Sequence, residues 1–275
     1  GGDGSPEKII NGIIHHLKND DSTFYKIFGD KDKILKLTSN KIPNNRYEII
    51  HTTVVVKGTD SPLEAAKRGK KTSMWLAVES VKNKETDIVI SAGNTGALLV
   101  IAKLNLKMIE NIDKPALSAL WPNKKGMSVV LDLGANVECS DKNLIDFAIM
   151  GSSLFKSLYP DETAKVALLN IGSEEIKGNE VIKETYKKLN QVENLDFEFK
   201  GYIEGNNLMK GEVNVIVSDG FTGNIALKTA EGTAKFVVDS LKESLTENIF
   251  SKLSLIFSYF SLKKLLHLLI LLTRP

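Results

Sequence analysis

Five short segments rich in glycine and small polar residues have the composition of oxyanion-binding turns. They read SAGNTGA from Ser91, DLGAN from Asp132, NIGSEE from Asn170, GYIEGN from Gly201 and SDGFTGN from Ser218. Glycine lets backbone N–H groups approach an anion closely, and a helix that begins in the turn adds the partial positive charge of its N-terminus. Because glycine and asparagine also end strands for conformational reasons, one such turn alone would be weak evidence. Five of them together predict a binding site for an anion such as phosphate.

The donors and charges within these turns define the predicted site. Lys177 is the expected cation for phosphate, although a lysine three residues after Glu174 can instead pair with that glutamate on a helix surface. Amide side chains are expected to stabilise a tetrahedral oxyanion, and aspartates to orient donors. The predicted catalytic residues are Lys177, Asn94, Asn136, Asn224 and Asp219. The other predicted ligand-binding residues are Asp3, Ser91, Gly93, Thr95, Gly96, Asp132, Gly134, Asn170, Gly172, Glu174, Gly220, Gly223 and Lys228.

Several motifs of other enzyme classes are missing from the sequence. It contains no GxxxxGK[ST] phosphate loop, no full GxGxxG dinucleotide fingerprint and no GxSxG nucleophile elbow. The four histidines show no metal-ligand spacing, so we expect neither a metal nor a cofactor. Cys139 could serve as a nucleophile or as a small buried apolar residue, and the second interpretation is favoured. The sequence therefore predicts direct attack by a bound anion rather than an acyl enzyme.

Alternating strand and helix patterns, from about residue 24 to residue 245, must position these turns. The expected strands are 24–28, 47–56, 87–91, 127–132, 165–170, 197–203 and 213–218. The expected helices are 63–81, 97–109, 144–158 and 174–189, with another that opens at Gly223 and Asn224. Strands that alternate with helices predict a three-layer α/β/α domain with a largely parallel sheet, which we assign to residues 1–245. In such a sheet all five turns would meet at the carboxyl edge.

Residues 246–275 have a different character. The run IFSKLSLIFSYFSLKKLLHLLILL is interrupted by lysines and a histidine, whereas a transmembrane helix needs about 20 nearly uncharged residues. Two short amphipathic helices that break near Ser261 fit better, as a helical hairpin for either dimerisation or contact with a membrane surface. The residues expected to make that contact are Phe257, Phe260, Leu265, Leu266 and Leu269.

Composition limits the class of protein. The 275 residues carry 36 basic and 34 acidic side chains, a formal net charge of +2. This balance argues against a nucleic-acid partner, which usually requires a marked basic excess. A single cysteine fits a reducing cytoplasm, and the glycine-rich, polar start does not resemble a signal peptide. We expect a cytoplasmic protein that associates peripherally with membranes.

Six ordered motifs together resemble the PlsX family of phosphate acyltransferases. They are GGDGSP from Gly1, DSP from Asp60 followed by KKTSM from Lys70, SAGNTGA from Ser91, DLGAN from Asp132, NIGSEEIKG from Asn170 and DGFTGNIALKTAEG from Asp219. Trp75 departs from the pattern, because arginine is often found there. The match extends from the start of the chain to about Gly232, and the amphipathic segment resembles the family's helical hairpin.

The resemblance implies a reversible transfer of a fatty acyl group from acyl carrier protein to inorganic phosphate, which yields acyl phosphate for phosphatidic acid and phospholipid synthesis. It also implies an isocitrate or isopropylmalate dehydrogenase-like fold, a homodimer, and a membrane acyltransferase that consumes the acyl phosphate. A basic patch of Lys67, Arg68, Lys70 and Lys71 could receive the acidic carrier protein, or could be a solvated helix face.

Two alternatives remain at this point, an NAD(P)-dependent oxidoreductase of the isocitrate or isopropylmalate type and an inactive scaffold at the membrane periphery. Members of the resembled family also have a strand before GGD and a further segment after the hairpin. We therefore expect this chain to be truncated at both ends.

Overall fold

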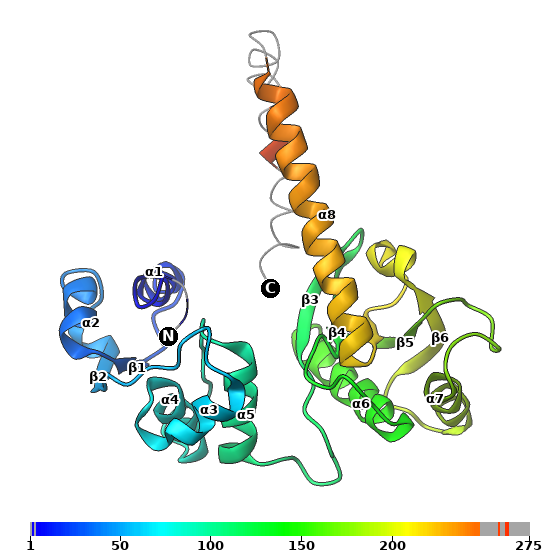
Figure 1. Ribbon diagram of the computed structural model, residues 1–275, viewed down its shortest axis with the longest axis horizontal. Coiled ribbons are helices and arrows are strands. Elements are labelled where there is room, and N and C mark those ends of the chain that lie inside the picture. The colour runs from blue at the N-terminus through cyan, green and yellow to red at the C-terminus, as the bar shows by residue number, and fades with distance from the viewer. Residues whose placement is uncertain (1, 3, 248–257, 259–261, 264–275) are drawn as a thin grey trace. The chain divides into compact units, whose positions relative to one another are not determined.

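A computed structural model describes residue 2, residues 4–247, residue 258 and residues 262–263 (Figure 1). The chain forms two compact units, residues 1–111 and 112–275. The domain predicted for 1–245 therefore contains two units, and its boundary at 245 stays a prediction. The predicted contact residues of the hairpin, Phe257, Phe260, Leu265, Leu266 and Leu269, lie outside the described residues, as does Asp3.

The first unit has a two-stranded parallel sheet, β1 (Tyr25–Gly29) and β2 (Tyr47–His51), with α1 (Glu7–His16) and α2 (Lys31–Thr38). Ile10, Ile27 and Ile34 join α1, β1 and α2 in one small core. A second core lies among α3 (Pro62–Arg68), α4 (Ser73–Lys82) and α5 (Thr95–Leu106), around Val78 and Ile101. Short 3-10 turns occur at Asn44–Arg46 and Gly69–Lys71.

The second unit is built on a five-stranded sheet of order β3-β4-β7-β5-β6. These strands are β3 (Ser118–Asn123), β4 (Gly126–Leu131), β5 (Lys165–Asn170), β6 (Glu198–Glu204) and β7 (Val215–Val217). The pairs β4–β7, β7–β5 and β5–β6 are parallel, and only β3 is antiparallel to its neighbour. The prediction of a largely parallel sheet is thus confirmed.

Helices cover both faces of this sheet, as its apolar strands require. On one face, α6 (Asp141–Leu158) and α7 (Glu180–Gln191) pack through Phe147, Phe155 and Leu189. On the other face, the first half of α8 (Gly220–Thr246) and the 3-10 turn η3 (Gly205–Lys210) cover Val130 and Ile216. Consecutive strand residues thus point into two separate cores, which confirms the three-layer α/β/α arrangement for this unit (Figure 1).

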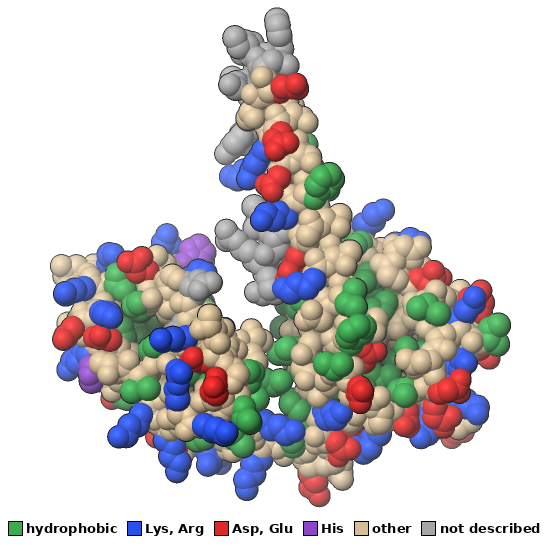
Figure 2. Space-filling model, in the orientation of Figure 1, with side chains coloured by type: hydrophobic (Ala, Val, Ile, Leu, Met, Phe, Trp, Pro, Cys, Tyr) green, Lys and Arg blue, Asp and Glu red, His purple; other side chains and the backbone are tan. Residues whose placement is uncertain are grey.

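The second half of α8 extends beyond the sheet in Figure 1. Phe236 on this part of the helix is 71% exposed. On the face shown in Figure 2, this part of the helix carries both basic and acidic side chains. No helix of the described part of the chain is both long enough and apolar enough to span a bilayer.

Several predicted elements differ from the structure. The strand predicted for 87–91 has no partner among the described residues, and Ile88 and Ile90 are exposed there. The helix predicted for 63–81 is divided into α3 and α4, because Gly69 has a positive φ of 76° and Thr72 caps a new helix. The helix predicted for 174–189 begins only at Glu180, after its N-cap Asn179. Strand β3 was not predicted.

Candidate active site

The turns after β4, β7, β5 and β6 lie in that spatial order along the carboxyl edge of the second unit's sheet. They comprise residues 132–136, 218–224, 170–178 and 204–206. The carboxyl edge is where ligands bind in open parallel sheets. The fifth predicted turn, 91–97, belongs to the first unit and does not follow a strand. The structure therefore does not place this turn at the end of a strand, and its meeting with the other four stays a prediction.

Asp132 organises the turn after β4. Its carboxylate is fully buried and accepts hydrogen bonds from the backbone amides of Leu117, Gly134, Ala135 and Asn136, at 2.8–3.1 Å. The Asn136 side chain donates to the same carboxylate at 2.8 Å and to the carbonyl of Pro115 at 2.7 Å. The amides of this turn therefore point inward at Asp132. The role of Asn136 as an oxyanion donor stays a prediction, but both of its amide hydrogens are donated to the protein here.

Helix α8 begins directly on this turn. Asp219 caps it by accepting hydrogen bonds from the Thr222 amide (2.7 Å) and the Thr222 hydroxyl (2.9 Å). A β-carbon added at Gly220 would lie 2.7 Å from Asn136 O, and one added at Gly223 would lie 2.0 Å from Asp132 O. These two glycines thus allow the helix to approach the backbone of 132–136.

Two other predicted residues lie on α8. The Asn224 side chain is exposed and donates one hydrogen bond to the carbonyl of Leu133 (3.0 Å), close to Gly134. Since an amide nitrogen has two hydrogens, a second donor remains for a ligand. Lys228 forms an ion pair with Glu231 at 2.7 Å. Of these two side chains, Asn224 is the better placed to meet a substrate at this edge.

The turn after β5 carries the predicted phosphate cation. Lys177 lies in a loop, not in the helix expected from the sequence, and its side chain is exposed. It has no hydrogen-bond or ion-pair partner among the described residues, so the alternative pair with Glu174 does not form. A β-carbon at Gly172 would lie 2.7 Å from Glu174 Oε2 and 3.0 Å from Lys177 Cγ. Both side chains therefore fold over this glycine.

Backbone amides in the same loop are also available. Within the described part of the chain, the amides of 173–176 have no acceptor, whereas the amide of Lys177 donates to the carbonyl of Glu174 at 2.9 Å. Successive unpaired N–H groups beside an unpaired ammonium form a suitable environment for an oxyanion. This loop is the strongest candidate for phosphate in the second unit.

The turn 91–97 organises the first unit in a similar way. Asn94 caps α5 through the Ala97 amide (3.0 Å), and its two amide hydrogens go to the carbonyls of Gly58 (3.1 Å) and Asp60 (2.9 Å). Gly93 donates its amide to the Ser91 hydroxyl at 3.2 Å. Asn94 thus ties the segments 58–60 and 91–97 together, and its role as an oxyanion donor stays a prediction.

Two backbone amides of this turn remain open. Those of Thr95 and Gly96, at the start of α5, have no acceptor among the residues that the structure describes. A β-carbon at Gly2 would lie 2.0 Å from Ala92 O, so Gly2 of the GGDGSP motif lies directly against the turn. Three motif segments of the first unit therefore meet at the N-terminus of α5.

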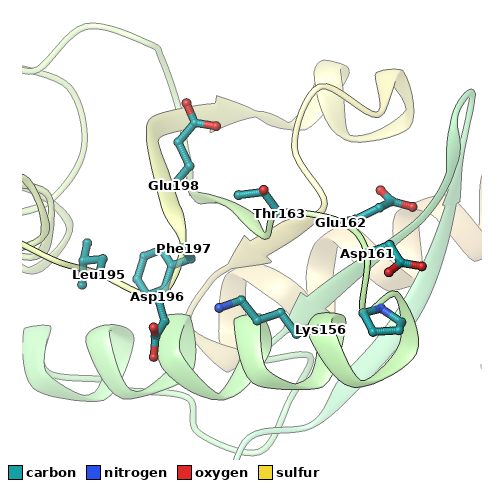
Figure 3. Close-up of a pocket in the computed structure, with 9 residues that line it drawn as sticks. Lys156, Asp161, Glu162, Thr163, Leu195, Asp196, Phe197 and Glu198 are labelled. Carbon is teal, nitrogen blue, oxygen red and sulfur yellow. The ribbon is translucent and has the colours of Figure 1, made fainter.

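One hollow of the second unit is remote from these turns. It has a volume of about 740 Å³ and opens at the amino ends of β5 and β6, opposite the edge that carries 170–178 (Figure 3). Asp161, Glu162, Asp196 and Glu198 surround it together with Lys156. An excess of carboxylates does not suit phosphate, so this hollow is not the predicted site.

Cys139 follows the turn 132–136. Burial raises the pKa of its thiol, and the nearby carboxylates of Asp132 and Asp219 add to that effect. Because only the thiolate is strongly nucleophilic, a raised pKa is unfavourable for an acyl-enzyme mechanism. The structure thus supports the interpretation of Cys139 as a small apolar residue.

Comparison with known proteins identifies the family. The pattern of the family described as "Fatty acid synthesis protein" matches residues 1–268. A protein of Pelagibacter ubique named "Phosphate acyltransferase" is 75% identical over 264 residues, which are 96% of this chain and 79% of that protein. A protein of the same name from Maricaulis maris is 43% identical, over 92% of this chain and 73% of its own length.

The chain belongs to this family. The resemblance to the PlsX phosphate acyltransferases is therefore confirmed, and the motif segments described above all lie within the matched residues. Among solved structures, the fold is similar to that of EutD phosphotransacetylase from Staphylococcus aureus, with a TM-score of 0.56, 16% identity and coverage of 84% of this chain and 81% of that one. A phosphotransacetylase from Streptococcus pyogenes gives a TM-score of 0.51 at 14% identity, over 83% of this chain and 87% of its own.

Sequence reasoning missed the residues that support these turns. Pro115 and Leu117 contribute a carbonyl and an amide to the Asn136–Asp132 network, but backbone atoms leave no signal in residue type. Tyr186 on α7 donates its hydroxyl to Glu175 at 2.9 Å. Its position in the apolar stripe of α7 gave no indication that it reaches the loop after β5.

Proposed function

We propose that this chain transfers a fatty acyl group from acyl carrier protein to inorganic phosphate and so forms acyl phosphate for phospholipid synthesis. The observation that carries the proposal is 75% identity, over 96% of the chain, to a protein named phosphate acyltransferase. The loop 171–178 adds physical support, because it combines an unpaired lysine with unpaired backbone amides. Together they favour an enzyme that brings phosphate to an acyl donor.

The proposed chemistry is a direct displacement. An oxygen of phosphate attacks the thioester carbonyl carbon, the carbon–sulfur bond breaks, and the carrier protein leaves as a thiolate that takes a proton from water. Phosphate is already anionic at neutral pH, so the site needs no strong general base. Its main contributions are proximity, orientation and stabilisation of the oxyanion.

The contacts suggest a division of roles. Lys177 and the amides of 173–176 bind phosphate, and Asn224 offers its second amide hydrogen to the tetrahedral oxyanion. Asp132 and Asp219 orient donors and do not transfer a proton, since both carboxylates accept several hydrogen bonds from the protein. Asn136 and Asn94 hold their own turns in shape.

A direct assay tests the proposal. The chain and a full-length relative are incubated with acyl carrier protein loaded with a fatty acyl group, with and without labelled phosphate. We expect thioester loss that depends on phosphate, and a labelled product that hydroxylamine converts to a hydroxamate. Thioester loss that is independent of phosphate would identify a thioesterase and contradict the proposal.

A separate experiment tests the dehydrogenase alternative, which no comparison supports. In it, NADH fluorescence is measured when the protein is mixed with NADH.

The partners are part of the same proposal. Lys67, Lys70 and Lys71 are exposed on α3 and the following turn, where an acidic carrier protein could dock, while Arg68 pairs with Asp60 at 2.6 Å. A homodimer, peripheral contact with the membrane through the C-terminal segment, and delivery of acyl phosphate to a membrane acyltransferase are further proposals. They rest on the sequence of 246–275 and on the family. The likeness to isocitrate dehydrogenase-type folds also stays a proposal.

A further inference from the structure

Asn170, the last residue of β5, contacts the loop 171–178 and not the solvent. Its side chain is buried, with only 7% of the residue exposed. The amide nitrogen donates to the carbonyl of Gly172 at 3.1 Å and to the carbonyl of Lys177 at 3.2 Å. One carboxamide therefore joins the first and last parts of the loop, and both of its donor hydrogens are used.

The carbonyl oxygen of the same side chain faces the protein as well. It is buried and has no hydrogen-bond partner within the described part of the chain. A β-carbon added at Gly178 would lie 2.5 Å from this oxygen, and the φ of Gly178 is +95°. Glycine at 178 thus lets the loop close over Asn170 and bury its carboxamide.

A second contact holds the middle of the loop. The Tyr186 hydroxyl donates to Glu175 Oε1 at 2.9 Å, and the Tyr186 ring stacks on that of Tyr202 with centroids 4.7 Å apart. The loop is therefore fixed near Gly172, at Glu175 and at Lys177. Such support is needed because the Lys177 side chain itself has no protein partner among the described residues.

We propose that Asn170 is a positioning residue, not a ligand: by joining the carbonyls of Gly172 and Lys177, it holds the Lys177 ammonium and the amides of 173–176 in one arrangement for phosphate. This inference rests on the proposed function. It assigns Asn170 a different role from the one that the sequence predicted, namely direct contact with the acyl donor or phosphate.

The substitution Asn170→Asp tests the proposal with almost no change in side-chain shape. A carboxylate oxygen replaces the donor and faces two carbonyl oxygens, so the loop should open. We expect the KM for phosphate to rise roughly tenfold while kcat changes less than about twofold, because a preformed binding contact is lost. In a Lys177→Ala background, the rise in KM caused by Asn170→Asp should be smaller than in the parent, because the part that acts through Lys177 is already lost.

Asn214 provides a matched control in the same sheet. It sits just before β7, where its side chain bonds to the Thr163 carbonyl (3.1 Å) and the Lys165 amide (2.6 Å) at the amino end of β5. Asn214→Asp should lower the melting temperature without changing the KM for phosphate. An equal rise in KM from Asn170→Asp in the parent and in Lys177→Ala would overturn the proposal, because Asn170 would then act independently of Lys177.

Hydrogen exchange of the Lys177 amide, which donates to the Glu174 carbonyl, tests the proposed loop structure without any turnover. Faster exchange in Asn170→Asp than in the parent is expected, and unchanged exchange would contradict the proposed closure of the loop. If the parent shows no phosphate-dependent thioester loss, the proposed function fails separately. Calorimetry with inorganic phosphate then decides the inference: weaker binding by Asn170→Asp supports it, and equal binding or no binding by the parent overturns it.

Discussion

At the scale of single residues, the structure separates side chains that shape the turns from those left open to a substrate. Asp132 and Asn136 use their polar atoms on the protein, whereas Lys177 uses none of its donors on the described residues. The sequence could select all three, because residue type and spacing are visible in it. The sequence could not show which of them bond to the protein and which stay open to a substrate, because hydrogen-bond partners come from segments distant in the chain, such as Pro115.

Lys177→Ala should reduce kcat/KM for phosphate by about ten- to a hundredfold, because one charge-assisted contact to the anion is lost. Lys187→Ala is the matched control, since Lys187 is an exposed lysine on the neighbouring helix α7. It should leave the kinetics unchanged. Steady-state rates over a range of phosphate concentrations measure both variants. Equal phosphate dependence in Lys177→Ala and the parent would remove this lysine from the site.

Cys139→Ser should retain turnover within about twofold, because the raised pKa of the thiol keeps it protonated near neutral pH and a thiol is a weak nucleophile. The raised pKa of the Cys139 thiol also predicts that this thiol is alkylated slowly. At pH 8 the native thiol should react with iodoacetamide more slowly than the same thiol in urea. Mass spectrometry of the enzyme quenched during turnover should show no acyl adduct, and an adduct on Cys139 would contradict direct attack by phosphate.

At the scale of elements, the four strands β4, β5, β6 and β7 were predicted from their apolar runs, with each end correct to within two residues. Strand β3 was missed because Pro122 lies within it, and proline is tolerated only where a strand does not need that N–H, as at a sheet edge. At 87–91, by contrast, a strand was predicted that the structure does not contain. Its β-branched residues fit a strand, but a strand also needs a hydrogen-bonding partner, and local sequence does not report one.

Two glycines of α8 give a direct test of how the helix packs. Gly223→Ala should destabilise the protein by about 1–3 kcal/mol, because the new β-carbon would meet Asp132 O at 2.0 Å and displace the helix start. At Gly232, in the same helix, nothing lies within 4 Å of an added β-carbon. Gly232→Ala should therefore stabilise the helix by about 0.5–1 kcal/mol. Urea unfolding of both variants measures the difference, and shifts of the same sign would contradict this packing.

At the scale of the whole molecule, the division into two units is the feature that the sequence did not indicate. The segment between α5 and β3 contains no glycine-rich or low-complexity linker that would mark a boundary. Its later residues contact the second unit instead: Lys114 donates to the carbonyl of Glu138 at 2.9 Å, and Ala116 packs against the core of that unit.

Limited trypsin digestion should therefore cut first after Lys107, which is exposed and follows the end of α5. The products should match residues 1–107 and 108–275. Lys107→Ala should remove this cut, whereas Lys103→Ala should not affect it, because Lys103 lies within α5. First cuts within the helices or strands of either unit would contradict a boundary near residue 111.

The last prediction concerns the segment 249–272, whose sequence is apolar with interspersed lysines. Acyl phosphate is an amphiphile, so release at a bilayer surface is physically favourable, and each inserted large side chain contributes about 1–3 kcal/mol. Leu266→Glu combined with Leu269→Glu should therefore abolish co-sedimentation with anionic liposomes. Leu63→Glu combined with Leu104→Glu is the control, because it adds the same charge at exposed positions of α3 and α5. This control pair should leave liposome binding unchanged. Undiminished liposome binding by the first pair would contradict membrane contact, and dissociation of a dimer in solution would instead identify the segment as a subunit interface.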